Sequence, residues 1–118
     1  MNIILFNKPY KVLCQFTDKK NTIKYRENLS NYINQKGFYA AGRLDYNSEG
    51  LLILTNNGAF QNKISNPKNK MKKSYLVQVE GHLDKDKIKV LQDGVYLKDG
   101  MTLPTKLQIL SCKPDIWE

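Results

Sequence analysis

Short apolar runs and alternating segments divide this chain of 118 residues into pieces with the length of β-strands. Four consecutive apolar residues, Leu51 to Leu54, lie between Gly50 and an Asn57-Gly58 turn signal, which is typical of a buried strand. Other segments alternate apolar and polar positions, as a strand with one buried face does. The pattern predicts strands over residues 2–6, 12–16, 38–41, 51–54, 75–79, 95–97 and 106–111, with a hairpin turn at Asp99-Gly100.

Other segments repeat apolar residues at the spacing of a helix. Helices are expected over residues 26–35, 59–65 and 84–91. Leu29 and Ile33 would share one face of the first helix, which Gly37 would end, and Asp84 would cap the third. Strands outnumber helices, without a strict strand–helix–strand order. The sequence therefore predicts one α+β domain over residues 1–118, built on a largely antiparallel, twisted mixed sheet with short flanking helices.

The balance of charge indicates a polyanionic partner. Nineteen lysines and arginines against eleven acidic residues give a net charge of +8, and a small domain this basic most often binds nucleic acid. A basic protein without such a partner is the alternative, whereas the chain lacks the long lysine-rich amphipathic helix that binds membrane surfaces. Four lysines in the polar segment 66–73 would contact phosphates or form an ordinary solvated surface: Lys68, Lys70, Lys72 and Lys73.

Several classes of chemistry lack the residues that they need. The single histidine, His82, and the distant cysteines Cys14 and Cys112 match no zinc or calcium spacing, so no metal is expected. No serine stands in a nucleophile elbow and no glycine-rich nucleotide motif is present, so no cofactor is expected. Reduced cysteines, with neither a signal peptide nor an apolar run of about 20 residues, predict a cytoplasmic protein that does not span a membrane.

The loop before the apolar run holds the candidate chemistry. Arg43 and Asp45 lie on it between Gly42 and Gly50, and a rigid strand behind the loop would hold a reactive group still. A surface ion pair is an equally good interpretation of these two residues. With aromatic residues on strands and a basic surface, the loop would also suit a nucleobase flipped out of RNA, with the carboxylate as nucleophile or base. From the residues alone, this reaction is one candidate among several.

A longer motif around this loop resembles the central motif of the bacterial ribosomal pseudouridine synthases of the RsuA-like family. The matching residues are Gly42-Arg43-Leu44-Asp45 and Ser48-Glu49-Gly50-Leu51-Leu52-Ile53-Leu54-Thr55-Asn56-Asn57-Gly58. Further segments are similar to that family's opening strand, its lysine-x-tyrosine strand and a later turn region: Leu5-Phe6-Asn7-Lys8-Pro9, Lys73-Ser74-Tyr75 through Gly81, and residues 93–104. Within the family, the chain resembles most the large-subunit (23S rRNA) synthase E subgroup, which begins at the catalytic domain without an N-terminal S4 domain.

The resemblance implies that a monomeric, cofactor-independent enzyme isomerises a uridine of 23S rRNA to pseudouridine. Asp45 matches the catalytic nucleophile, which lets the base detach, rotate and reattach through carbon 5. Attack on the ribose, attack on the ring and removal of a sugar proton stay open as its first step. Tyr75 matches the aromatic residue that stacks on the uracil. Arg43 matches the arginine that supports the flipped-out base, and Lys73 matches a basic residue at the edge of the cleft.

Members of that family continue beyond the matched part into a Gly-Arg-x-x-Gln-Val-Arg-Arg-like motif, whose first arginine pairs with the catalytic aspartate. No such motif precedes Glu118. We therefore expect this chain to be part of a catalytic domain, with little or no activity by itself, because Asp45 would lack that positive charge. Two other functions stay open: an RNA-binding module without catalysis, and a structural piece with no function of its own.

Overall fold

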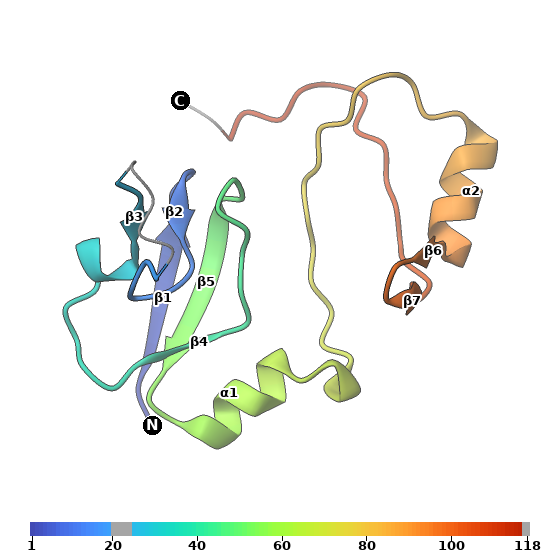
Figure 1. The fold of residues 1–118 in the computed structure, drawn as a ribbon. Helices are drawn as coiled ribbons and strands as arrows, with labels where there is room; N and C mark the ends of the chain where they lie inside the picture. Colours follow the sequence, from blue (N-terminus) through green and yellow to red (C-terminus); the bar gives the residue numbers. More distant parts are fainter. Residues whose placement is uncertain (20–24, 117–118) are drawn as a thin grey trace. The chain divides into compact units, whose positions relative to one another are not determined.

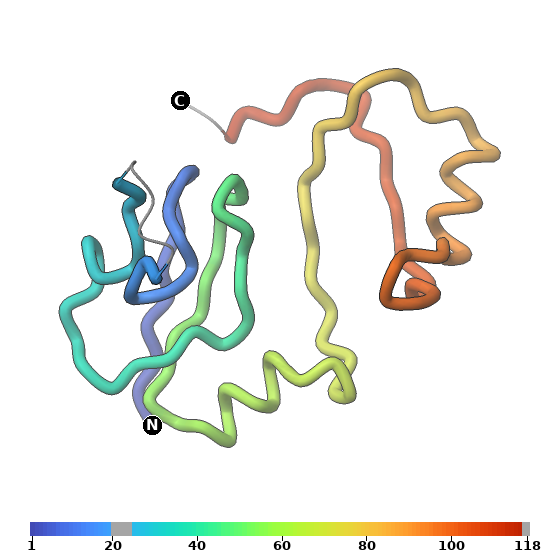
Figure 2. The backbone as a smooth tube through the Cα atoms, in the orientation of Figure 1, coloured from blue at the N-terminus to red at the C-terminus, as the bar shows by residue number. Residues whose placement is uncertain are grey.

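A computed structural model of the chain describes residues 1–19 and 25–116 (Figure 1). By its contacts the chain divides into two compact units, Met1–Ser74 and Tyr75–Glu118. Figure 2 follows the backbone through the first unit, from blue to yellow-green, and then through the second, to red. The expectation of one domain over residues 1–118 stays a prediction.

The first unit is organised around a three-stranded antiparallel sheet. Strands β1 (Ile3–Lys8) and β4 (Tyr39–Ala41) both pair with the central strand β5 (Gly50–Thr55). The register of β1 against β5 places Lys8 opposite Gly50. Each of these strands lies within a few residues of its predicted position, so the apolar pattern located the sheet correctly.

Strand β5 has one buried face, whereas its apolar run predicted a strand buried throughout. Leu52 and Leu54 are 2% and 0% exposed, but Leu51 is 63% exposed. Successive side chains of a strand point to opposite faces, so the two buried leucines share the face that carries the core. The buried core cluster on that face comprises Cys14, Leu29, Ile33, Leu52 and Leu54.

The helix predicted over residues 26–35 is wrong. In its place the chain forms a short strand, which pairs in parallel with another short strand, and one 3-10 turn. These elements are β2 (Val12–Leu13), β3 (Glu27–Asn28) and η1 (Leu29–Asn31). The N–H of Leu29 donates to the carbonyl of Gln15 at 2.9 Å, so it cannot join a helix that starts upstream. Leu29 and Ile33 are both buried, and one turn suffices to put them on the same side.

Helix α1 (Gly58–Ser65) follows β5 as predicted. The side chain of Asn57 caps it by accepting a hydrogen bond from the N–H of Phe60 at 2.9 Å. Gln61 donates to the carbonyl of Ala40 at 3.0 Å, which fixes α1 against β4. The 3-10 helix η2 (Pro67–Asn69) comes next, at the end of the sheet that is remote from the β4–β5 loop (Figure 1).

The second unit contains a helix and a hairpin. Helix α2 (Lys85–Asp93) begins at the predicted N-cap, where Asp84 accepts a hydrogen bond from the N–H of Lys87 at 2.9 Å. Strands β6 (Tyr96–Leu97) and β7 (Gly100–Met101) form the antiparallel hairpin that the sequence predicted. Both predictions rested on local capping and turn residues, which act within their own segment.

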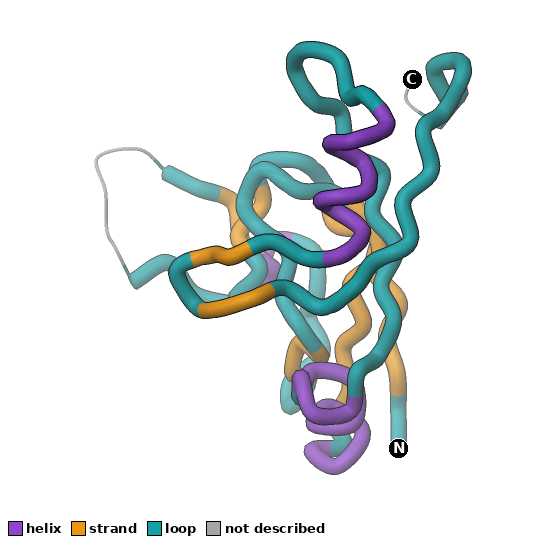
Figure 3. Tube along the Cα trace, turned by 90° about the vertical axis from the view of Figure 1, so that its right-hand side faces the viewer, coloured by secondary structure: helices purple, strands orange, loops and turns teal. Residues whose placement is uncertain are grey.

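The strands predicted over residues 75–79 and 106–111 are wrong, because neither segment pairs with a described strand. Figure 3 draws the stretch between η2 and α2 as loop. Alternation shows which residues could face a core, but a strand also needs a neighbouring backbone for its N–H and C=O groups. The predicted α+β class with largely antiparallel sheets is confirmed, since β2–β3 is the only parallel pair in the described part of the chain.

Candidate functional site

The loop 42–49 joins β4 to β5 and contains Asp45. Gly42 and Gly50 border it with φ angles of +91° and +134°, a region that other residues enter only under strain. Between them, the N–H of Ser48 donates to the carbonyl of Asp45 at 3.0 Å. Asp45 therefore starts a hydrogen-bonded turn just before the central strand of the sheet.

Asp45 lines an open pocket of about 560 Å³, within the range of roughly 300–1,000 Å³ that is typical of ligand sites. Three cations and one carboxylate face it: Lys19, Arg26, Arg43 and Asp45. The remaining lining residues are Leu13, Cys14, Gln15, Leu44 and Tyr46. A site with this excess of positive charge suits an anionic ligand such as the phosphate backbone of RNA.

Arg43 and Asp45, the two residues predicted from the loop, share this pocket. Both side chains are exposed. Arg43 donates from Nη2 to Oε1 of Gln15 at 3.5 Å, which is the long limit of a hydrogen bond. The ion pairs between described residues do not include one between Arg43 and Asp45. The alternative interpretation of the loop, a surface ion pair between them, is therefore not supported.

Lys8 lies close to the loop, although no role in the site was predicted for it from the sequence. Its side chain is 0% exposed, and Nζ donates to the carbonyls of Pro9 at 3.0 Å and Val12 at 2.8 Å. Burial lowers the pKa of Lys8, while neighbouring groups, Asp45 among them, act in the opposite direction. A lysine that ends an apolar strand just before a proline is the only signal the sequence offers for this buried charge.

Arg26 and Tyr46 form another part of the pocket wall that sequence reasoning missed. The guanidinium of Arg26 donates from Nε and Nη2 to the two carboxylate oxygens of Asp18, at 2.9 and 2.6 Å. Its Cζ lies 5.9 Å from the centroid of the Tyr46 ring. The hydrogen bond to Asp18 is the main cause that raises the pKa of Arg26. Arg26 and Arg43 are the two arginines of a chain that is otherwise rich in lysine. The scarcity of arginine was the signal in the sequence that could have pointed to Arg26.

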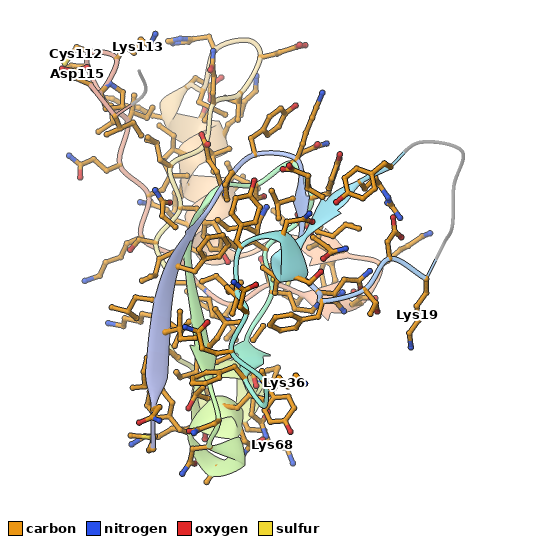
Figure 4. All side chains as sticks on the ribbon, turned by 90° about the vertical axis from the view of Figure 1, so that its left-hand side faces the viewer. Lys19, Lys36, Lys68, Cys112, Lys113 and Asp115 are labelled. Carbon is orange, nitrogen blue, oxygen red and sulfur yellow. The ribbon has the colours of Figure 1, made fainter. Side chains whose placement is uncertain are left out.

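The other predicted residues lie outside this pocket. Lys68, Lys70, Lys72 and Lys73 are all exposed, and none of them lines it. Lys68 belongs to η2 and lies well apart from Lys19, which does line the pocket (Figure 4). Tyr75 is the first residue of the second unit and is 68% exposed. The roles expected of these five residues stay predictions.

Metal and membrane chemistry find no support in the described residues. In residues 1–19 and 25–116, no group of histidine, cysteine and acidic side chains is placed to hold a metal ion. No helix in the same ranges combines the length and the apolar character that crossing a membrane requires.

Comparison with known families matches residues 2–115 to the family described as RNA pseudouridylate synthase. The chain is 50% identical over 116 residues to a protein of Vibrio parahaemolyticus named ribosomal large subunit pseudouridine synthase E, covering 98% of this chain and 47% of that protein. It is 44% identical over 115 residues to a protein of Xanthomonas campestris with the same name, covering 98% of this chain and 60% of the relative.

A solved structure titled as a pseudouridylate synthase has the same fold. Its TM-score to this chain is 0.79, with 26% sequence identity, over 92% of this chain and 46% of that one. The chain thus spans about half the length of the Vibrio relative and of this structural neighbour. The family match over residues 2–115 includes both the loop 42–49 and the lysine-x-tyrosine segment, on which the resemblance was based.

Proposed function

The chain belongs to the RNA pseudouridylate synthase family, and from this membership we propose that the complete gene product converts a uridine of 23S rRNA to pseudouridine. The names of the relatives, which refer to the large ribosomal subunit, support this choice of RNA. The observation that carries the proposal is the family match over residues 2–115, with Asp45 on an exposed, hydrogen-bonded turn inside a cationic pocket.

Asp45 is the nucleophile of the proposed reaction. The reaction breaks the bond between ribose carbon 1′ and uracil nitrogen 1, and it joins the same ribose carbon to uracil carbon 5. Carbon 5 loses its proton and nitrogen 1 gains one, so atoms and electrons balance without an oxidant or a cofactor. A carboxylate can form a covalent intermediate that divides this rearrangement into easier steps. The exposure of Asp45 and its place in a closed turn support this role.

Two cations lie near Asp45 in the proposed site. Lys8 supplies a buried ammonium whose own pKa responds to Asp45, and Arg43 extends into the same pocket. In the proposal, Arg43 holds the backbone of the flipped-out nucleotide, because a guanidinium makes strong hydrogen bonds to phosphate. Lys8, which is fully buried, acts on the carboxylate through its charge alone.

Tyr75 and four lysines also have roles in the proposed function. The Tyr75 ring is 68% exposed, so a flipped-out uracil can reach its face, and stacking of a base on an aromatic ring is worth about 1–3 kcal/mol. Lys73, together with Lys68, Lys70 and Lys72, contacts RNA phosphates in this proposal. Their exposure leaves their ammonium groups open to a polyanion.

Substitution of Asp45 tests the proposed function. In the complete gene product, Asp45→Asn keeps the size of the side chain but removes the charge and the nucleophile. We expect it to lower the rate of pseudouridine formation on a 23S rRNA transcript by about a thousandfold or more. Asp99→Asn is the matched control, since it makes the same change at a hairpin turn. A variant Asp45→Asn with the activity of the control would refute the assignment.

RNA binding without catalysis is the second candidate function, favoured by the run of exposed lysines. It predicts that the chain binds rRNA fragments with a steep dependence on salt and forms no pseudouridine. The two candidates separate in one assay, because turnover that depends on Asp45 is compatible only with the first.

A further inference from the structure

Arg26 and Tyr46 line the pocket of Asp45, and Asp18 pairs with Arg26, yet the proposed reaction gives these three residues no task. We propose that Arg26 is a positioning residue, which holds Tyr46 and, through it, the turn that presents the Asp45 carboxylate to the uridine. This inference rests on the proposed function and concerns the same site. Three observations support it: the fixed orientation of Arg26, its contact with Tyr46, and the place of Tyr46 in the turn.

Asp18 fixes the orientation of the Arg26 guanidinium. Two parallel hydrogen bonds, of 2.9 and 2.6 Å, join Nε and Nη2 to the two oxygens of one carboxylate. The side chains are 25% and 17% exposed, so the pair is partly shielded from water. A paired fork of this kind fixes the direction of both groups, and a lysine cannot reproduce it.

The oriented guanidinium lies over the ring of Tyr46. The distance of 5.9 Å from Cζ to the ring centroid falls within the range of about 6 Å for a cation–π contact. Tyr46 is only partly buried, so this contact restricts a ring that would otherwise have room to turn. Because Arg26 precedes β3 and Tyr46 belongs to the β4–β5 loop, the contact ties the loop to the body of the first unit.

The position of Tyr46 determines the position of Asp45. Tyr46 follows Asp45 directly and lies inside the turn that the Ser48 N–H closes onto the Asp45 carbonyl at 3.0 Å. A shift of the ring therefore moves the backbone that carries the nucleophile. Catalytic groups must be held within about 0.5 Å of their productive position, and a displacement of about 1 Å can cost a hundredfold in rate.

A double-mutant cycle in the complete gene product tests this role. We expect Arg26→Ala to lower kcat for pseudouridine formation by about ten- to a hundredfold, with KM changed by less than about threefold. Tyr46→Leu should lower kcat to a similar degree, and the double variant should lose no more than either single one, because both remove the same support. Tyr46→Phe keeps the ring and should stay within about twofold of the wild type.

Lys89→Ala is the matched control, because it also removes a cation that is paired with an aspartate, at 3.1 Å on the exposed face of α2; it should leave kcat unchanged. If Arg26→Ala does not fold, Arg26→Lys replaces it in the cycle, since it keeps the charge but loses the fork. A higher KM with an unchanged kcat would overturn the proposal, because that result marks Arg26 as a direct RNA contact. Losses that multiply in the double variant would overturn it equally.

An NMR measurement separates this inference from the proposed function. Ring current from Tyr46 should shift the Nε–H signal of Arg26, and Tyr46→Leu should remove that shift while Tyr46→Phe retains it. An Nε–H signal that is identical in all three proteins would overturn the positioning role, whether or not the enzyme is active. By contrast, a wild-type protein with the shifted signal and no pseudouridine product would contradict the proposed function alone.

Discussion

At the scale of single residues, the buried lysine Lys8 lies near Asp45, the proposed nucleophile. Lys8 is fully buried, and two backbone carbonyls hold its ammonium. Burial lowers its pKa, against the opposing influence of Cys14, Glu49 and Asp45. Lys8 is therefore a buried, hydrogen-bonded lysine of the first unit.

Lys8→Met should destabilise the first unit. The carbonyls of Pro9 and Val12 lose their donor, and a buried acceptor without a partner costs about 1–3 kcal/mol. Urea unfolding at pH 7 measures the change, with Lys36→Met, an exposed lysine, as the control. Equal stability of the two variants would contradict the structural role of Lys8.

The pH dependence of the unfolding free energy of wild type and Lys8→Met gives a separate prediction. Burial lowers the pKa of Lys8 below its ordinary value of 10.5. Between the folded and the unfolded pKa, the unfolded state binds more protons, so the stability that depends on Lys8 rises as the pH rises toward 10.5. The stability difference between wild type and Lys8→Met should therefore grow with pH in that window. A difference that shrinks with rising pH would show that the folded state raises this pKa.

At the scale of elements, local signals predicted correctly where local chemistry decides. Asp84 caps α2 as predicted, and Asn57, from the predicted Asn57-Gly58 turn, caps α1. The segment 75–79 was predicted wrongly because a strand depends on a partner elsewhere in the chain. The segment 26–35 was predicted wrongly because a carbonyl at Gln15 takes the N–H of Leu29. Helical spacing in the sequence contains no information about such a distant acceptor.

Gly94→Ala tests the junction between α2 and the hairpin. Gly94 has φ +115°, and an added Cβ would lie 2.6 Å from the carbonyl oxygen of Thr102. Because both the backbone angle and the close oxygen oppose a side chain, we expect a cost of about 1–3 kcal/mol. Amide hydrogen exchange in α2 should become correspondingly faster.

The control for this junction is Gly58→Ala at the start of α1, where an added Cβ meets no atom within 4 Å. That change should be neutral or stabilise the protein by up to about 1 kcal/mol, since alanine favours a helix. Similar effects of the two substitutions would contradict the close contact at Gly94.

At the scale of the whole molecule, the buried core lies in one of the two units. The buried apolar residues of the described chain all belong to the first unit, which holds the Asp45 pocket. The sequence allowed Arg43 and Asp45 to be placed together, because both lie on one loop. It did not reveal Arg26 and Lys8 as neighbours of Asp45, because folding brings them there from separate segments.

The net charge of +8 predicts a strong dependence of RNA binding on salt. Changing Lys68, Lys70, Lys72 and Lys73 to glutamine lowers the net charge from +8 to +4. If these lysines contact phosphates of single-stranded RNA, the slope of log K against log salt should become shallower by about 2–3, because each lost contact accounts for about 0.7 of the slope. The control variant changes four lysines of the second unit to glutamine and has the same net charge of +4: Lys85, Lys87, Lys89 and Lys98. An equal loss of slope in both variants would show that overall charge, rather than this segment, binds the RNA.

The central claim is that Asp45 makes this protein a pseudouridine synthase of the large ribosomal subunit. The most direct measurement maps pseudouridines in 23S rRNA from cells that lack the gene and carry a copy of wild type, Asp45→Asn or Asp99→Asn. We predict that one or more pseudouridines disappear without the gene and return with wild type and Asp99→Asn, but not with Asp45→Asn. A map that is unchanged by the loss of the gene, or is restored by Asp45→Asn, would contradict the claim.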